Sequence, residues 1–418
     1  MNDMKFALKG NAIVGQSGGP TTAINATLAG VIRGALANEN IGTVYGMRNG
    51  IEGLLDRRII DLGETVGTAE KLHMLERTPA AALGSCRKKL PSVDSKDEKD
   101  IAVYQRIFDI LAEYDIRYFF YIGGNDSMDT AAKMSKFSEK CGYDIRIIGV
   151  PKTIDNDLLV TDHTPGYGSA AKYIATTMQE IIRDCAVYTT KAVTIVEIMG
   201  RDAGWLTAAS AVGSIVNGQA PDLVYLPERA FNMEEFYSSI EKAFEKHPNI
   251  VVAISEGIRF ADGRYVCEGE DGAATDVFGH KALSGAGKAL ELAVKARFGC
   301  KVRSIELNLP QRCAAHILSK TDITESVAIG KEAVRVAVEE GVSGEMMIFE
   351  RMSNSPYFCT VGHKKVADIA NMVHSVPDEY INDEGNFVTE ACCEYILPLI
   401  EGEDAPTFYK GIPEYIIL

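Results

Sequence analysis

YIGGNDS (residues 121–127) and PKTIDND (residues 151–157) decide the fold, and each follows an apolar, strand-like run, YFFYI and IRIIGV. Each stretch lies where a buried strand would end and a loop would begin. In an open α/β sheet, ligands bind in the loops at the carboxyl ends of parallel strands. The two stretches therefore predict adjacent strand ends that carry a binding site.

Three carboxylates occur in these two loops. Asp155 and Asp157 are two positions apart, and we expect Asp126 to lie in the preceding loop, directly after a Gly-Gly turn. Acidic residues beside glycine-rich turns are typical of sites that bind a metal ion and phosphate, with one carboxylate free to act as a base. The loops therefore predict phosphate chemistry at this edge of the sheet.

The remainder of the chain alternates between strand-like and helix-like segments. We expect strands at NAIVGQ, IGTVYGM, AVTIVEI, LVYLP, NIVVAIS, VRSIELN and EMMIFE, and helices over residues 22–37, 128–141, 169–185, 205–212, 233–247, 283–298 and 326–340. This alternation predicts mostly parallel sheets covered by helices, because apolar, β-branched strands suit burial on both faces. The fold class is α/β.

Composition limits the other possibilities. A chain of 418 residues is too long for one simple core, so two domains are expected. The net charge of −15 argues against nucleic acid as the main partner, since proteins that bind it carry basic patches. The chain shows no secretion signal and no apolar stretch of about 20 residues, and its nine cysteines are scattered, so we expect a cytoplasmic protein without membrane contact.

Further motifs place polar residues near other strand ends. They are SGGPTTAIN (residues 17–25), GSCRKKL (residues 84–90), EIMGRDAGW (residues 197–205), ISEG (residues 254–257) and VRSIELNLPQR (residues 302–312). A glycine turn before a helix suits phosphate, and an arginine at a strand end suits a phosphate or sugar hydroxyls. Each motif alone is as well explained by an ordinary turn or a surface ion pair, but their recurrence favours a site. GAGKAL (residues 285–290) lacks the features of a P-loop, and we interpret it as part of an ordinary helix.

Taken in order, SGGP, GSCR, GGNDS, PKTIDND, EIMGR, SEG and the Arg-x8-Arg run resemble the phosphofructokinases, from residue 11 to the mid-300s. The resemblance implies two Rossmann-like domains with the active site in the cleft between them. Residues 1–168 with about 311–350 would bind the phosphoryl donor and magnesium. Residues 169–310 with about 351–418 would bind the sugar phosphate, the last part being a C-terminal extension.

Two positions indicate the pyrophosphate-dependent branch of that family, diphosphate–fructose-6-phosphate 1-phosphotransferase. ATP-dependent members typically read GGDGS and PGTIDND, whereas Asp126 and Lys152 replace one glycine of each motif here. A glycine lets the α-phosphate of ATP approach the backbone, while an aspartate fills that space and repels the phosphate. Lys152 can supply positive charge to a leaving phosphate that carries no adenosine.

The resemblance also implies roles for individual residues. Asp155 would be the general base, with Lys152 and Asp126 as further catalytic residues. Gly18, Arg87 and Gly124 would bind the donor, and Asn125 and Asp157 would hold Mg²⁺. The substrate-binding residues would be Thr153, Ile154, Asp155, Met199, Gly200, Arg201, Glu256, Arg303, Leu309, Pro310, Gln311 and Arg312, with Arg303 reaching the 6-phosphate, in one arrangement across a subunit interface.

Three positions depart from the family pattern. Asn125 stands where the family has a metal-linked aspartate, Leu309 replaces a histidine near the sugar, and Ala192 replaces an arginine for which Lys191 is a possible substitute. An amide can still ligate magnesium or orient its water, but it brings no charge.

The main interpretation is an enzyme that reversibly transfers a phosphoryl group from pyrophosphate to the 1-hydroxyl of fructose 6-phosphate, giving fructose 1,6-bisphosphate and phosphate, a glycolytic reaction. The alternatives are an ATP-dependent or dual-donor phosphofructokinase and a non-catalytic regulatory subunit that binds sugar phosphates. A dinucleotide oxidoreductase is disfavoured because the chain lacks GxGxxG followed by a ribose-binding acid. The family implies a homodimer or homotetramer.

Overall fold

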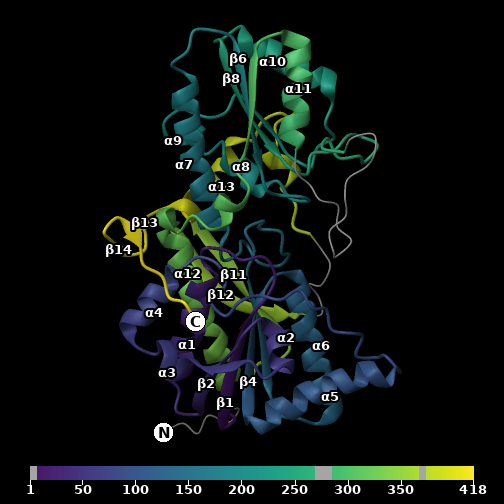
Figure 1. Cartoon of the computed structure of the whole chain (residues 1–418), viewed down its shortest axis with the longest axis vertical. Helices are drawn as coiled ribbons and strands as arrows, with labels where there is room; N and C mark the ends of the chain where they lie inside the picture. The colour runs from purple at the N-terminus through teal and green to yellow at the C-terminus, as the bar shows by residue number, and fades with distance from the viewer. Residues whose placement is uncertain (1–6, 269–284, 367–372) are drawn as a thin grey trace.

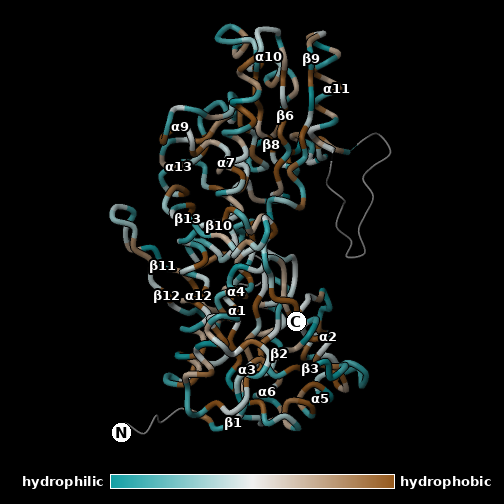
Figure 2. Tube along the Cα trace, turned by 60° about the vertical axis from the view of Figure 1, so that its left-hand side comes forward, coloured by the Kyte–Doolittle hydropathy of each residue, from teal (hydrophilic) through white to brown (hydrophobic). Residues whose placement is uncertain are grey.

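The computed structural model describes residues 7–268, 285–366 and 373–418. Figure 1 and Figure 2 show two lobes stacked along the long axis, each built around its own sheet, with β10 (Leu318–Ser319) and β13 (Glu403–Asp404) at the waist between them. The prediction of an α/β chain with two mostly parallel sheets is confirmed.

The first lobe contains a seven-stranded sheet in the order β12-β11-β5-β4-β1-β2-β3. Its five inner strands are parallel to one another, and the edge strands β3 and β12 pair antiparallel with β2 and β11. The strands are β1 (Gly10–Gln16), β2 (Ile41–Met47), β3 (Ile59–Asp61), β4 (Ile116–Gly123), β5 (Arg146–Pro151), β11 (Glu345–Asn354) and β12 (Tyr357–Lys365). β4 reads IRYFFYIG and is buried along almost its whole length, as expected for a central parallel strand.

The second lobe contains a four-stranded, fully parallel sheet in the order β7-β8-β6-β9. Its strands are β6 (Ala192–Ile198), β7 (Leu223–Tyr225), β8 (Asn249–Ser255) and β9 (Lys301–Glu306). β6 and β8 are central and buried, whereas β9 is an edge strand with several exposed side chains. A small hairpin, β14 (Phe408–Tyr409) with β15 (Ile412–Pro413), lies near the end of the chain.

Helices cover both sheets. In the first lobe they are α1 (Ile24–Leu36), α2 (Gly50–Leu55), α3 (Leu62–Val66), α4 (Ala69–Glu76), α5 (Glu98–Glu113), α6 (Asn125–Cys141) and α12 (Lys320–Arg335), which continues as a π-helical turn over Val336–Glu340. In the second lobe they are α7 (Tyr167–Cys185), α8 (Trp205–Ala209), α9 (Gly213–Val216), α10 (Met233–Phe244), α11 (Ala286–Phe298) and α13 (Glu390–Ile396). Short 3₁₀ turns cover Leu309–Arg312, Ala315–Ile317, Asp378–Tyr380 and Leu397–Ile400. No helix among the described residues is both long and apolar enough to cross a bilayer.

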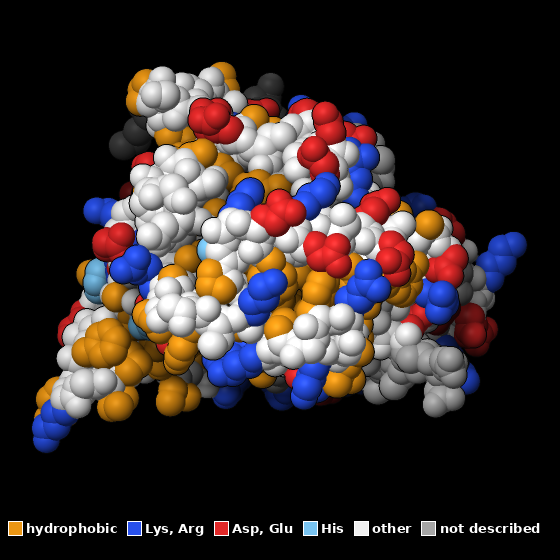
Figure 3. Space-filling model, turned by 90° about the horizontal axis from the view of Figure 1, so that it is seen from above, with side chains coloured by type: hydrophobic (Ala, Val, Ile, Leu, Met, Phe, Trp, Pro, Cys, Tyr) orange, Lys and Arg blue, Asp and Glu red, His pale blue; other side chains and the backbone are white. Residues whose placement is uncertain are grey.

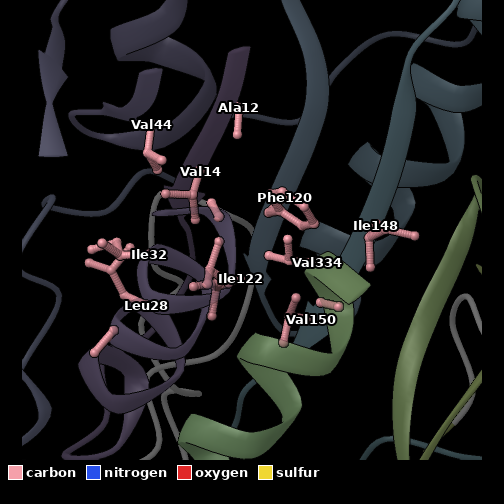
Figure 4. Close-up of a cluster of buried hydrophobic side chains, with 14 of the residues drawn as sticks. Ala12, Val14, Leu28, Ile32, Val44, Phe120, Ile122, Ile148, Val150 and Val334 are labelled. Carbon is pink, nitrogen blue, oxygen red and sulfur yellow. The ribbon is translucent and has the colours of Figure 1, made fainter. Parts of the chain in front are cut away.

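The core of the first lobe forms where α1 and α12 pack side by side on the sheet. Figure 4 shows Leu28 and Ile32 of α1 and Val334 of α12 facing strand residues such as Val14 and Phe120. The two helices approach closely at Gly30 and Gly330, because a Cβ at either position would lie 2.3 Å from a carbonyl oxygen of the other helix. This contact holds α12, which follows the second lobe in sequence, firmly against the first.

The predicted helices are found, with shifted ends. The segment GAGKAL lies at the start of α11, as expected of an ordinary helix. Residues 283 and 284, with which that helix was predicted to begin, are outside the described residues.

On the face seen in Figure 3, acidic and basic side chains are interspersed.

The C-terminal part of the chain belongs to both lobes, which corrects the expected division at residue 350. β12 pairs with β11 in the first sheet, so residues 357–365 are part of the first lobe. α13 packs in the core of the second lobe, and Ile416 and Leu418 then return to the core of the first. β12 reads YFCTVGHKK, and strand pairing, which composition does not specify, decides which sheet it joins.

Candidate active site

A cavity of about 600 Å³ lies between the two lobes. It opens at the carboxyl ends of β1, β4 and β5 on one side and of β6 and β8 on the other. Its lining residues include Ser17, Gly18, Gly19, Pro20, Thr21, Cys86, Arg87, Lys88, Lys89, Gly124, Asn125, Asp126, Lys152, Thr153, Ile154, Asp155, Asp157, Met199, Arg201, Asp202, Glu256 and Arg312. Most of the residues predicted from the sequence motifs are therefore brought together in one place.

The Gly18–Gly19 turn after β1 supports the basic segment that follows α4. The Gly18 N–H donates to the Cys86 carbonyl at 3.1 Å, and the Ser85 hydroxyl donates to the Gly18 carbonyl at 2.6 Å. Gly18 has a φ of +80°, a conformation that favours glycine. These bonds hold the segment in place, so that Arg87, Lys88 and Lys89 line the cavity.

Lys152 lies directly after β5 and is almost fully buried, with 3% of its surface exposed. Its ammonium donates to the Gly19 carbonyl at 2.5 Å. Burial lowers the pKa of Lys152 to about 8, although Asp155 and Asp157 oppose this effect. The side chain therefore remains a cation at neutral pH, placed beneath the glycine turn.

The GGNDS motif forms the amino end of α6, which begins at Asn125, three residues before the predicted start. Asp126 is thus in the first helical turn and not in a loop, which corrects the sequence interpretation. The amino end of α6 lines the cavity, and no side chain caps it. The positive end of the helix dipole therefore suits an anion at this point. Asp126 is largely exposed and forms an ion pair with Lys89 at 3.0 Å.

Asp155 and Asp157 line the cavity from the loop after β5. The Asp155 N–H donates to the Thr153 hydroxyl at 3.1 Å, and the Thr153 carbonyl accepts from the Thr164 hydroxyl at 2.8 Å. Burial raises the pKa of Asp155, and the charges of Asp157 and Glu256 raise it further. Burial also raises the pKa of Asp157. A carboxylate with a raised pKa is a better proton acceptor near neutral pH.

The second lobe supplies the opposite wall. The Met199 N–H donates to Gln311 Oε1 at 3.2 Å, and the Gly200 N–H faces Glu256 Oε1 at 3.4 Å. Burial raises the pKa of Glu256 to about 7. Among the described residues, the buried Arg201 Nε and Gln311 Nε2 have no hydrogen-bond partner. Buried donors of this kind normally have one, and a polar ligand in the cavity would satisfy Arg201, which lines it.

Five predicted substrate-binding residues are not among those that line the cavity: Gly200, Arg303, Leu309, Pro310 and Gln311. Arg303 lies on the edge strand β9, beside Cys185 and Thr194, in a separate depression. Leu309 is exposed and neither it nor Pro310 lines the cavity. Lys191, the possible substitute for the missing arginine, lies over the Phe244 ring at 5.0 Å. Motif order along the chain does not reveal that Arg303 lies in another depression, away from the cleft.

The structure adds residues that the motif comparison did not select. Lys88 and Lys89 line the cavity beside Arg87, and Asp202 lies on the opposite wall. The basic run GSCRKKL contains both lysines, but taken alone such a run is typical of a solvated surface. Only the hydrogen bonds to the Gly18–Gly19 turn distinguish the two interpretations.

The donor set in the cavity fits a hard cation. Asn125 Oδ1 is buried without a hydrogen-bond partner among the described residues, and Asp157 adds a carboxylate to the same cavity. Magnesium prefers oxygen ligands and is held by one or two carboxylates together with substrate phosphates. Asn125 and Asp157 are therefore suitable ligands for Mg²⁺.

Comparisons with known proteins agree with this geometry. The family model described as phosphofructokinase matches residues 11–337. The pyrophosphate–fructose 6-phosphate 1-phosphotransferase of Methylococcus capsulatus is 41% identical over 98% of this chain and 96% of its own length. That of Xanthomonas campestris pv. campestris is 42% identical, with the same coverage. The crystal structure of a pyrophosphate-dependent phosphofructokinase from Nitrosospira multiformis covers 98% of this chain and 96% of its own, at 37% identity and a TM-score of 0.87.

Proposed function

Since the chain belongs to the phosphofructokinase family, we propose that it is the enzyme that transfers a phosphoryl group reversibly between pyrophosphate and the 1-hydroxyl of fructose 6-phosphate. The products in the forward direction are fructose 1,6-bisphosphate and phosphate. The observation that carries the proposal is one cavity with two chemically different walls, and with Asp155 between them. Relatives of similar length at 41% and 42% identity carry the name of this activity.

The cationic wall suits the donor. Arg87, Lys88, Lys152 and Arg312 line the first-lobe side of the cavity, and the uncapped end of α6 adds the positive end of its dipole. Pyrophosphate carries its charge in a small volume and needs such neutralisation. When bound, Mg²⁺ would neutralise further phosphate charge, held by Asn125 and Asp157.

The second-lobe wall suits the sugar phosphate. Arg201 can donate to a phosphate or hydroxyl, and Glu256 can accept from a hydroxyl. Asp155 would then take the proton of the 1-hydroxyl as its oxygen attacks the donor phosphorus. The bond from that phosphorus to the leaving phosphate breaks, and the leaving phosphate departs towards Lys152.

Two side chains support pyrophosphate over ATP. Lys152 fills the space beneath the Gly18–Gly19 turn, and Asp126 occupies the start of α6, where ATP-dependent relatives have glycines. Asp126 is exposed and paired with Lys89, so solvent and the lysine weaken its repulsion of a nucleotide phosphate. We therefore assign the exclusion of a nucleotide mainly to the volume of the paired side chains.

A donor assay tests the proposal. The purified protein is given fructose 6-phosphate and Mg²⁺ with either pyrophosphate or ATP, and fructose 1,6-bisphosphate is measured. We expect turnover with pyrophosphate, little with ATP, and none after the metal is chelated. Turnover with ATP alone would refute the donor assignment, comparable turnover with both would indicate a dual-donor enzyme, and turnover with neither would favour the regulatory subunit.

A further inference from the structure

The residue between the two catalytic-loop aspartates has an unusual backbone. Asn156 is fully buried and has a φ of +54°, in the left-handed region that residues other than glycine rarely adopt. Asp155 and Asp157 both line the cavity, while the Asn156 side chain is directed towards α13. The direction of both carboxylates therefore depends on keeping Asn156 in this conformation.

One hydroxyl from α13 holds the loop at two points. Asn156 Nδ2 donates to the Tyr395 hydroxyl at 3.1 Å, and that hydroxyl donates to the Asp162 carbonyl at 2.6 Å. The two partners are six positions apart in the chain, so the Tyr395 hydroxyl links the start of the loop to its end. Because Asn156 and Tyr395 are buried, water cannot replace these bonds without cost.

Tyr395 itself is held in place. The Arg351 guanidinium lies 4.3 Å from the centre of its ring, and Arg351 Nη1 donates to the Tyr395 carbonyl at 2.8 Å. Arg351 Nε also donates to Asp162 Oδ1 at 3.0 Å. The ring of Trp205 packs at 5.1 Å on another side. These contacts fix the hydroxyl, so it can determine where Asn156 lies.

We propose that Tyr395 is a positioning residue for the phosphoryl transfer: its hydroxyl keeps Asn156 in the left-handed conformation and so aims Asp155 at the reacting hydroxyl. The inference rests on the proposed function and names a residue outside residues 11–337, the part of the chain that the family model matches. The C-terminal extension thus takes part in ordering the active site.

Tyr395→Phe tests the proposal, because it removes the hydroxyl and keeps the packed ring. We expect kcat to fall by about 10- to 100-fold, since small misplacements of a catalytic group have effects of this size, while KM for fructose 6-phosphate changes by less than about threefold. Tyr380→Phe is the matched control, because its ring packs on Tyr395 at 5.9 Å in the same aromatic cluster. We expect the control to keep its kcat.

A double-mutant cycle identifies the route of the effect. Asn156→Gly removes the side chain that bonds Tyr395 and still permits a positive φ. We expect Tyr395→Phe to lower kcat by less than about threefold in that background, because the route through Asn156 is already lost. An equal loss in both backgrounds, or an unchanged kcat in Tyr395→Phe alone, would overturn the proposal. If Tyr395→Phe does not fold, Asn156→Gly alone tests the same bond, and an unchanged kcat would overturn it.

Hydrogen exchange gives a readout that does not require activity. We expect the amides of residues 156–162 to exchange faster in Tyr395→Phe than in wild type, and not in Tyr380→Phe. Unchanged exchange in this loop contradicts the positioning role even if the wild type turns over neither donor. An inactive wild type with faster loop exchange in the variant would instead contradict only the proposed function.

Discussion

Single side chains decide the electrostatics of the cavity. Lys152 comes directly after β5, and its ammonium is buried against the Gly19 carbonyl. The raised pKa of Asp155 and the lowered pKa of Lys152 bring the two groups closer together on the pH scale. The Asp155 carboxylate and the Lys152 ammonium therefore coexist near neutral pH. The proposed phosphoryl transfer requires both of these charged forms.

The lowered pKa of Lys152 predicts an alkaline limit to activity. The lysine is charged below its pKa of about 8 and neutral above it. We expect kcat/KM for pyrophosphate to fall as pH rises through about 8, by about tenfold per pH unit. Lys152→Arg keeps the charge at high pH, so its alkaline limb should move upwards even if the overall rate is lower. If kcat/KM of this variant falls at the same pH as that of the wild type, a group other than Lys152 causes the alkaline loss of activity.

Elements are positioned by contacts that have no local sequence signal. α12 follows the second lobe in sequence yet packs on α1, with Gly30 and Gly330 at the crossing. The position of α6 is equally important, because its first turn carries Asn125 and Asp126 to the cavity. A shift of either helix would change the shape of the donor half of the site.

The close crossing of α1 and α12 predicts that Gly330→Ala is destabilising. The new Cβ would lie 2.3 Å from the Thr27 carbonyl, which is backbone and cannot move independently. We expect the free energy of unfolding to fall by about 2 kcal/mol, measured by chemical denaturation. Gly63→Ala in α3 is the control, since its Cβ would meet side-chain atoms at 3.2 Å or more. Equal stability of the two variants would show that the helices separate without cost.

At the scale of the whole molecule, the C-terminal segment connects the two lobes. Lys172 of α7 donates to the Gly402 carbonyl at 2.6 Å, and Arg77 of the first lobe bonds both oxygens of Asp404. The Ser319 hydroxyl at the waist donates to the Leu399 carbonyl at 2.7 Å. These bonds hold the lobes on either side of the cavity, so the extension contributes to the site that it helps to order.

A buried histidine makes the stability of the whole chain pH-dependent. Burial alone would lower the pKa of His163, but hydrogen bonds to Asp162 and Glu325 outweigh it and raise the pKa from 6.5 to about 9. The raised pKa contributes stability that is fully present below pH 6.5 and is lost as pH rises through about 9. The contribution is on the order of 3 kcal/mol.

We therefore expect the free energy of unfolding to decrease between pH 6.5 and 9.5, measured by urea denaturation at fixed protein concentration. His163→Gln should be less stable at pH 6.5 and should show a shallower decrease, because the group that titrates is gone. A variant whose stability follows the same pH curve as wild type would show that His163 does not carry the dependence.

The sequence by itself determined the alternation of strands and helices, because buried parallel strands require continuous apolar runs and their loops require turn residues. It also determined which loops carry the chemistry: Gly18, Lys152, Asp155 and Glu256 were predicted from motifs, and all line one cavity. These features are local, so a short window of residues contains the physical reason for each.

Only the tertiary structure decided which distant residues meet. Arg303 lies on an edge strand outside the cavity, Lys89 pairs with Asp126, and β12 joins the first sheet. Tyr395 reaches Asn156 across 239 positions of the chain. Such contacts depend on strand order and on the packing of helices between lobes, which no local pattern encodes, and they set the precise direction of the side chains that the motifs supply.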